Sequence, residues 1–384
     1  MSGQPFKRGN SWAFVVELPT DPMTGKRRQK WHSGYRTRKE AERARVEKLA
    51  EIQTGAYIAT SKETLASYIP EWLQAIATTI RPATLHSYER NLRLHVLPRV
   101  GALPLVKIDA GVLNGLYSHL LTSGRRDGRG GLSPRTVRYI HTILHRALKD
   151  AVRWGRLLRN PADAADPPRA GASASPEIVT WEAADLRRFL EAAEGDRLYA
   201  AFLLIATTGM RRGEALGVRW GDIDFEDGRA AIRQTVVAVN HQVQLGTPKT
   251  AKSRRSVALD KGTVAALRAH RQRQLEERML MGPGFADHDL VFCKVTGEPL
   301  HPERFSREFD RRVERWGLSP LTIHGLRHTW ATLALKAGIH PKLVQERLGH
   351  ANVGITLDIY SHATPAMESE AAETVAGVVF GPHR

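Results

Sequence analysis

The chain has 384 residues, with 57 Lys or Arg against 40 Asp or Glu, which gives a formal charge of +17 and a sequence pI near 10.3. At roughly 100–200 residues per domain this length allows two to four domains, and 42% hydrophobic with 25% charged residues excludes wholesale disorder. The single cysteine, Cys293, excludes an internal disulfide or a cysteine-based zinc site, and no apolar run approaches the ~20 residues of a membrane span, so we predict a soluble cytoplasmic protein.

The positive charge is concentrated at the beginning of the chain. Residues 1–60 sum to +6, residues 61–170 to +9, and residues 171–384 to only +2. This asymmetry predicts that the first part binds a polyanion, although a basic surface that only aids solubility is the plainer alternative. Nucleic acid is favoured over a membrane, because no segment pairs a basic face with a strongly apolar one.

Residues 1–60 read as a small β-sheet plus one helix. Strand-like stretches at 11–18 and 27–31 flank the turn-rich residues 21–25, which predicts a hairpin. The spacing of Thr37 and Glu40 is that of a capping box, so a helix is predicted to begin there and to run to Gly55.

Residues 61–160 read as all-α, because apolar residues recur at helical spacing behind caps and prolines. The clearest helix begins at Ser133 and Pro134 and ends at Gly155. Its polar face carries Arg138, Arg146 and Lys149, which either follow a phosphate backbone or form an ordinary solvated face. Residues 161–176 lack periodicity and are rich in proline and glycine, which predicts an interdomain linker.

Residues 177–384 read as a mixed α/β, mostly helical domain. A helix capped by Thr180 is predicted to end at Gly195, followed by a buried helix around 202–206. Strands are predicted at 229–239 and 255–259, and helices from there to the end of the chain.

The first candidate for chemistry is Arg211, in Thr-Gly-Met-Arg-Arg-Gly-Glu at 208–214. An arginine in the first turn of a helix opposes the helix dipole, and this placement becomes favourable when an anion sits there. Arg211 is therefore a candidate phosphate ligand. An ion pair between Arg211 and Glu214 that closes the turn is an equally good interpretation, and the two are compatible.

The second candidate is His-Gly-Leu-Arg-His-Thr at 324–329, where His324 and Arg327 share one helix face. A guanidinium beside an imidazole disfavours the protonated imidazole, so His324 suits a neutral acceptor or proton shuttle near an anion. His328 lies at a different angle and is interpreted as a packing residue.

Two further positions are weaker when taken alone. Tyr360 follows Leu-Gly-His at 348–350, and a tyrosine hydroxyl becomes a nucleophile only when its proton is removed or cations stabilise its phenolate. A packed tyrosine whose hydroxyl caps a neighbour is the commoner use of this residue. Lys249 lies in a turn before a strand, where most lysines are simply solvated.

Taken together, the motifs at 208–214, 324–329 and 348–350, with a tyrosine at 360 followed by Ser-His, resemble the tyrosine recombinases of the phage integrase family. Their order and spacing match the family from about 180 to 365. The resemblance implies a multidomain protein with an arm-type DNA-binding domain at 1–60, a helical core-binding domain at 61–160, a linker at 161–176 and a catalytic domain at 177–384.

The resemblance also implies the role of each site residue. Arg211 and Arg327 match the two arginines that hold the scissile phosphate, and His324 and His350 match the two histidines beside it. Tyr360 matches the nucleophile, which forms a 3′-phosphotyrosyl intermediate. Lys249 matches the lysine that protonates the leaving 5′-oxygen, and the nearby Lys252 keeps that assignment open. No metal, ATP or other cofactor is implied.

The implied activity is site-specific DNA recombination by the integrase of a phage or other mobile element. The implied partners are double-stranded DNA at core and arm sites and a directionality factor or host DNA-bending protein. The implied assembly is a homotetramer on DNA, joined through residues 365–384, and the implied location is the nucleoid in the cytoplasm. A topoisomerase with type IB-like chemistry and a non-catalytic DNA-binding regulator are the alternatives.

Overall fold

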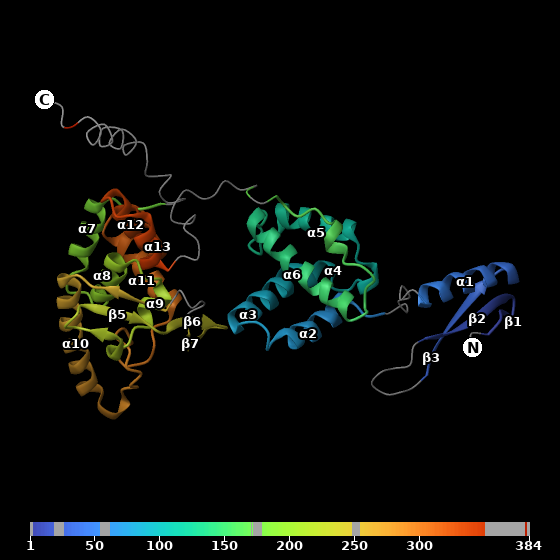
Figure 1. Cartoon of the computed structure of the whole chain (residues 1–384), viewed down its shortest axis with the longest axis horizontal. Coiled ribbons are helices and arrows are strands. Elements are labelled where there is room, and N and C mark those ends of the chain that lie inside the picture. The colour runs from blue at the N-terminus through green and yellow to red at the C-terminus, as the bar shows by residue number, and fades with distance from the viewer. Residues whose placement is uncertain are drawn as a thin grey trace. The chain divides into compact units, whose positions relative to one another are not determined.

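The computed structural model describes residues 3–18, 27–53, 62–169, 171, 179–247, 254–349 and 381. The chain divides into two units, Met1–Ser175 and Pro176–Arg384, which are described separately below. Figure 1 shows the small N-terminal sheet, the helical segment that follows it and the mixed α/β unit. No helix of the described residues is long and apolar enough to cross a bilayer.

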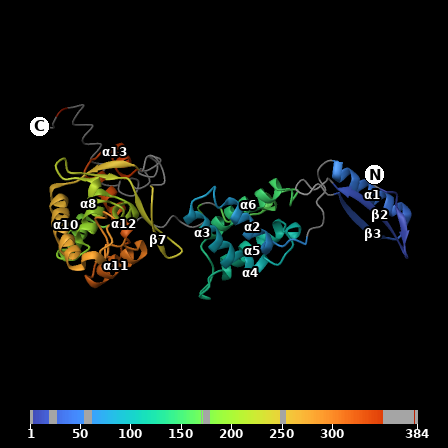
Figure 2. The same ribbon diagram turned by 90° about the horizontal axis from the view of Figure 1, so that it is seen from below.

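The N-terminal sheet has three antiparallel strands in the order β1-β2-β3, formed by Phe6–Arg8, Ser11–Leu18 and Arg28–Tyr35. Helix α1, Arg38–Gln53, lies along one face of this sheet in both views (Figures 1 and 2). Fully buried side chains fill the space between sheet and helix: Phe14, Val16 and Ala41.

The predicted hairpin and helix of this part are confirmed. The Thr37 hydroxyl accepts from the Glu40 N–H at 3.1 Å, and the Glu40 carboxylate accepts from the Arg36 N–H at 3.0 Å. These two hydrogen bonds satisfy backbone N–H groups that would otherwise have no partner at the start of a helix, which is why α1 begins here. The first strand, β1, was not predicted because three residues carry no periodicity. The turn at 21–25 and Gly55 lie outside the described residues.

The helical segment carries α2, α3, α4, α5 and α6, which span Leu65–Ile76, Pro82–Asn91, Leu97–Val100, Ala110–Ser123 and Pro134–Arg153. The predicted start of α6 is confirmed, since the Ser133 hydroxyl accepts from the Thr136 N–H at 3.2 Å. Side chains at helical spacing on α6 are buried against the other helices, namely Val137, Ile140, Ile143, Leu144, Ala147, Leu148 and Ala151. An all-α segment is therefore confirmed.

The linker predicted over 161–176 is wrong in its first part. A short 3₁₀ turn at Pro161–Ala164 follows Asn160. The Asn160 side-chain Nδ2 donates to the His145 backbone carbonyl at 3.1 Å, and its side-chain Oδ1 accepts from the Ala162 N–H at 3.0 Å. Ala162 and Ala165 then pack into the helical core. The composition resembles a linker, but an asparagine turn and small apolar side chains let this stretch pack instead.

The second unit is mixed α/β and mostly helical, as predicted. Its helices are α7 Ala183–Ala193, α8 Tyr199–Thr208, α9 Arg212–Leu216, α10 Lys261–Met281, α11 Pro302–Arg315, α12 Ile323–Lys336 and α13 Pro341–Leu348. Helix α8 is buried in the middle of this unit (Figure 2). It contacts α7, α10 and α12. This central position follows from its sequence, because α8 is apolar on every side.

The strands of this unit form two small antiparallel sheets. One has the order β4-β5-β8, from Ile223–Asp224, Arg229–Ile232 and Arg255–Ala258, and the other pairs β6, Thr235–Val239, with β7, Gln242–Gly246. The predicted strand at 229–239 is thus two strands that belong to different sheets. Strand β7 was missed, although Asn240 and His241 have the positive φ values, 49° and 62°, of a two-residue hairpin turn.

Helix α7 begins at Ala183, so the predicted cap at Thr180 is wrong. The reason is Trp181, which is fully buried and keeps the chain before the helix extended. Its backbone N–H donates to the Thr329 hydroxyl at 3.0 Å and its indole N–H to the Ser319 carbonyl at 2.9 Å. These two tertiary contacts override the local capping preference.

Candidate active site

The turn between α8 and α9 positions the first candidate residue, Arg211. Helix α8 ends at Thr208 and is capped by Gly209, which has the left-handed φ of 66°, and Arg211 is the N-cap of α9. The Glu214 carboxylate accepts from the Arg211 backbone N–H at 3.1 Å, which closes the turn. The two residues that close this turn, Arg211 and Glu214, therefore also bring charged side chains to it.

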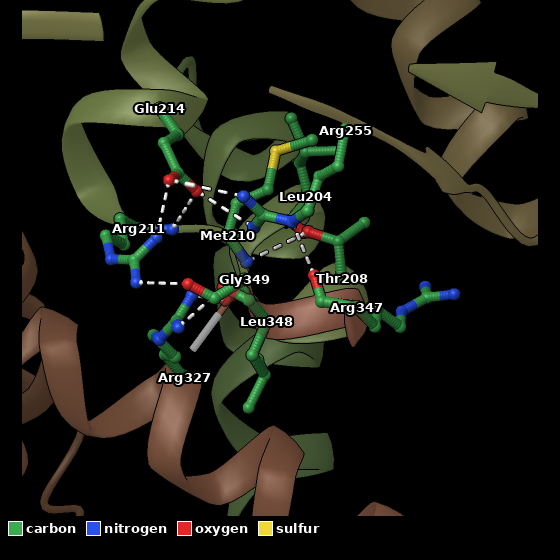
Figure 3. A network of polar contacts seen from close by, with 11 residues as sticks. Leu204, Thr208, Met210, Arg211, Glu214, Arg255, Arg327, Arg347, Leu348 and Gly349 are labelled. Atoms are coloured by element: carbon green, nitrogen blue, oxygen red, sulfur yellow. Dashed lines mark hydrogen bonds and ion pairs between the residues drawn. The ribbon is translucent and has the colours of Figure 1, made fainter. Parts of the chain in front are cut away.

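Glu214 is a buried carboxylate shared by two arginines (Figure 3). Its Oε1 lies 2.8 Å from Arg211 Nη1, and its Oε2 lies 3.0 Å from Nη2 of Arg255, the first residue of β8. Burial acts to raise the pKa of Glu214, but hydrogen bonds and charge from Arg255 and Arg211 outweigh it and lower the pKa. The predicted ion pair exists, and the Arg211 side chain still keeps 38% of its surface exposed.

Arg327 lies beside this pair on α12 and is only 2% exposed. Its Nη1 donates to the Gly209 carbonyl at 2.7 Å and its Nη2 to the Leu348 carbonyl at 2.8 Å. Burial and the charges of Arg211 and Arg255, opposed by Glu214, lower the pKa of Arg327 to about 9. Within the described ranges no carboxylate pairs with Arg327, and a buried cation without such a partner is of a kind that an anion would stabilise.

The two guanidiniums meet at the end of α13. Arg211 Nη2 donates to the Gly349 carbonyl at 3.0 Å, next to the Leu348 carbonyl that accepts from Arg327 (Figure 3). These backbone carbonyls hold the two guanidinium groups in place. Because carbonyls are uncharged, they do not neutralise the guanidinium charges. The predicted pairing of Arg211 and Arg327 at one site is therefore present in the structure.

His324 is the second residue of α12, the helix that carries Arg327, and its ring stands perpendicular to that of His328, with centroids 4.8 Å apart. Burial, then the charges of His328 and Arg327, lowers the pKa of His324 to about 4, although the side chain keeps access to solvent. The imidazole is thus neutral at physiological pH. The sequence predicted this direction from the neighbouring arginine, but the largest cause is burial.

Four of the predicted positions lie outside the described residues. These are Lys249, the alternative Lys252, His350 and Tyr360. His328, interpreted as a packing residue, is half-buried on α12, and burial together with Arg327 lowers its pKa.

Sequence reasoning missed Arg255 as part of this site. Arg255 is 9% exposed in its side chain, and its Nε donates to the Arg347 carbonyl at 2.6 Å in addition to its contact with Glu214. No local pattern separates it from the neighbouring Arg254. Among the described residues, no group of three or more His, Cys, Asp or Glu side chains is arranged to hold a metal ion.

Replacing Glu214 by glutamine is expected to lower the free energy of unfolding by about 3 kcal/mol, because two arginines lose the carboxylate that compensates their charges in the interior. Calorimetry of the full chain measures this as a lower unfolding temperature for the unit at 176–384. The matched control is Glu182→Gln, whose exposed pair with Lys336 is worth less than about 1 kcal/mol. Equal shifts for the two variants would contradict the role given to Glu214.

Replacing Gly209 by alanine is expected to destabilise the same unit by about 1–3 kcal/mol. A Cβ at this position would lie 2.6 Å from Leu348 Cδ2 and 2.9 Å from Trp330 Cε3, in a backbone conformation that side chains rarely adopt. Gly195→Ala is the control, since Gly195 has a φ of 81° with nothing within 4 Å. If Gly209→Ala and Gly195→Ala lower the unfolding temperature equally, the close side chains at Gly209 add nothing to the cost of a positive φ in alanine.

His324 makes the stability of this unit sensitive to acid. Its folded pKa of about 4 lies below the ordinary 6.5, so the unfolded chain binds more protons between these values and stability falls as the pH drops from 6.5 toward 4. The unfolding temperature of His324→Gln is therefore expected to fall less between pH 7 and pH 5 than that of the unaltered protein. Parallel curves for the two proteins would contradict this assignment.

Comparison with known families places each part of the chain. Residues 180–367 match the phage integrase family, residues 6–53 match an arm DNA-binding domain, and residues 64–121 match the N-terminal SAM-like domain of phage integrases. The three matches follow the order of the parts described above.

Relatives of similar length support the same grouping. A tyrosine recombinase described as XerC-like from Caldanaerobacter subterraneus subsp. tengcongensis is 29% identical over 357 residues, covering 88% of this chain and 90% of the relative. An integrase from Streptomyces ambofaciens is 27% identical over 361 residues, covering 91% of this chain and 88% of the relative.

Solved structures share the fold. The integrase of the Tn1549 transposon, solved with a circular intermediate DNA, aligns with a TM-score of 0.66 at 22% identity over 82% of this chain and 99% of that one. A lambda integrase tetramer bound to a Holliday junction aligns at 0.55 and 19% identity, over 93% of this chain and 94% of that one. The chain belongs to the phage integrase family, and it is a tyrosine-type site-specific recombinase that acts on DNA.

Proposed function

We propose that this chain is the integrase of a phage or integrative element, and that it cleaves and rejoins DNA through a 3′-phosphotyrosyl intermediate. The observation that carries the proposal is the pair Arg211 and Arg327, two guanidiniums fixed by carbonyls of the α8 and α13 ends. Arg327 is buried without a carboxylate partner among the described residues, and a phosphodiester supplies the missing negative charge.

Tyr360 is the proposed nucleophile. Its phenolic oxygen forms a bond to phosphorus while the bond from phosphorus to the 5′-oxygen breaks, which leaves a 3′-phosphotyrosyl ester and a 5′-hydroxyl. Arg211 and Arg327 stabilise the charge that grows on the non-bridging oxygens. The ester keeps the energy of the broken bond, so a second 5′-hydroxyl rejoins the strand by the reverse step and releases Tyr360.

The proton transfers are assigned to the remaining predicted residues. Lys249 protonates the leaving 5′-oxygen, and neutral His324 accepts the tyrosine proton or binds the phosphate. His350 donates to a phosphate oxygen. In support of that role, the carbonyl of Gly349, the residue immediately before His350, accepts from Arg211.

The first two parts of the chain are proposed to bind DNA at positions away from the phosphate that reacts. Residues 1–60 bind arm sites, residues 61–160 bind core sites, and residues 177–384 catalyse the reaction. The charge distribution supports this division, since the first 170 residues hold most of the positive excess. By analogy with the lambda integrase tetramer, we propose a homotetramer on DNA, assisted by a directionality factor or a host DNA-bending protein.

The test is covalent trapping on DNA that carries the junctions of the element, with a nick that lets the cleaved end diffuse away. We expect a denaturant-resistant complex of protein and DNA that forms in the presence of a chelator. A non-catalytic regulator gives tight, salt-sensitive binding without this complex. Relaxation of plasmids that lack the junction sequences would favour the topoisomerase, and cleavage abolished by the chelator would indicate a metal-dependent nuclease.

A further inference from the structure

Arg255 is an arginine of this network with a largely buried side chain, and it has no step in the proposed reaction. It is the first residue of β8, and its side chain reaches two other elements, bonding Glu214 of α9 and the Arg347 carbonyl of α13. Its side chain is only 9% exposed and is held inside the protein by Glu214 and the Arg347 carbonyl, which leaves little of it to contact DNA.

The charges at the site explain what Arg255 adds. An isolated pair of Arg211 and Glu214 has no net charge. Without a further cation, the negative charge of Glu214 would therefore cancel the positive charge that Arg211 offers to a phosphate. Arg255 brings a second positive charge to the same carboxylate. With Arg327, the three guanidiniums and one carboxylate sum to +2.

The neighbouring Arg347 does not perform this role. Its guanidinium points away from Glu214 (Figure 3), donates to the Thr207 and Ala258 carbonyls at 3.2 and 2.9 Å, and lies 5.1 Å from the Trp330 ring centroid. Arg347 therefore contributes its backbone carbonyl to Arg255, and Arg255 supplies the charge at Glu214.

We propose that Arg255 is a positioning residue that shares the charge of Glu214, so that Glu214 does not cancel the positive charge that Arg211 presents to the scissile phosphate. The inference rests on the proposed function. When a tyrosine phenolate adds to a phosphodiester, the two charges combine, so the transition state carries about two negative charges against one in the bound diester. A site of net +2 favours the transition state, and loss of Arg255 lowers the cleavage rate more than DNA affinity.

The experiment compares single-turnover cleavage of two nicked substrates, one with the natural phosphodiester and one with a neutral methylphosphonate at the position that the unaltered protein cleaves. Arg255→Gln is expected to slow cleavage of the phosphodiester by roughly a hundredfold and of the methylphosphonate by roughly tenfold or less. DNA affinity is expected to stay within about threefold. A residue that only supports the fold would slow both substrates by the same factor.

The double variant Glu214→Gln with Arg255→Gln restores the sum of +2 and contains no uncompensated buried carboxylate, so it also serves if the single variant does not fold. It is expected to cleave the phosphodiester at least roughly tenfold faster than Arg255→Gln and to show the substrate ratio of the unaltered protein. Arg312→Gln, which removes a partly buried arginine paired with Asp196 elsewhere in the unit, is expected to leave the ratio of the two cleavage rates unchanged.

The outcomes separate this inference from the proposed function. If the unaltered protein forms no covalent complex, the proposed function fails. If it cleaves, and Arg255→Gln slows both substrates equally or the double variant keeps a disturbed ratio, only the charge-sharing role of Arg255 is overturned.

Discussion

Replacing Tyr360 by phenylalanine is expected to abolish the covalent complex with DNA, with cleavage falling below detection. The substitution removes one oxygen atom, the proposed nucleophile, and leaves the rest of the side chain unchanged. Because the arginines proposed to hold the phosphate are unchanged, affinity for the same DNA is expected to stay within about threefold. Gel analysis under denaturing conditions measures the complex, and a mobility shift measures the affinity.

The control for this variant is Tyr199→Phe. Tyr199 and Tyr360 are the tyrosines of residues 177–384, and Tyr199 begins α8 with its side chain partly buried. Its loss of a hydroxyl is expected to leave the covalent complex intact. A complex that persists in Tyr360→Phe and disappears in Tyr199→Phe would reverse the assignment.

The second large effect is expected for Arg327→Lys, which should slow cleavage by roughly a hundredfold to a thousandfold. A lysine keeps the charge but has no planar fork, so it cannot bond the Gly209 and Leu348 carbonyls while facing a phosphate. Because charge is retained, affinity for DNA is expected to fall much less than the cleavage rate. Single-turnover cleavage and equilibrium binding measure the two effects separately.

Arg197→Lys is the matched control for this substitution. Arg197 is a partly buried arginine of the same unit, and its guanidinium bonds Glu277 at 2.6 and 2.7 Å and the Cys293 carbonyl at 2.8 Å. Its replacement is expected to lower the unfolding temperature and to leave the cleavage rate unchanged below that temperature. A cleavage loss of similar size in both variants would mean that Arg327 acts only through stability.

The sequence predicted those features of the fold that depend on local pattern. Ser133 and Pro134 start α6 as predicted, and the uniformly apolar 202–206 stretch lies in the buried helix α8, because caps and apolar periodicity act within a few residues. Tertiary contacts that no local pattern reveals caused the errors. Trp181 delays α7 through bonds to Thr329 and Ser319, and Ala162 and Ala165 place part of the predicted linker in the core.

The site residues also divide into those that local motifs predict and those that only the folded chain brings together. Arg211 and Arg327 were predicted from motifs and meet in the structure, and the ion pair between Arg211 and Glu214 follows from their spacing on one helix turn. The third cation, Arg255, comes from a strand 41 residues away, and only the folded chain brings it to Glu214. Partners of a buried charge are set by topology, which single motifs do not encode.

The most direct test of the central claim is to identify the residue that carries the DNA in the trapped complex. Digestion with trypsin after nuclease treatment yields a peptide over residues 348–384, in which Tyr360 is the sole tyrosine. Mass spectrometry is expected to find the nucleotide remnant on Tyr360, joined through a 3′-phosphate. A remnant on any other residue, or a linkage through a 5′-phosphate, would contradict the mechanism proposed for this chain.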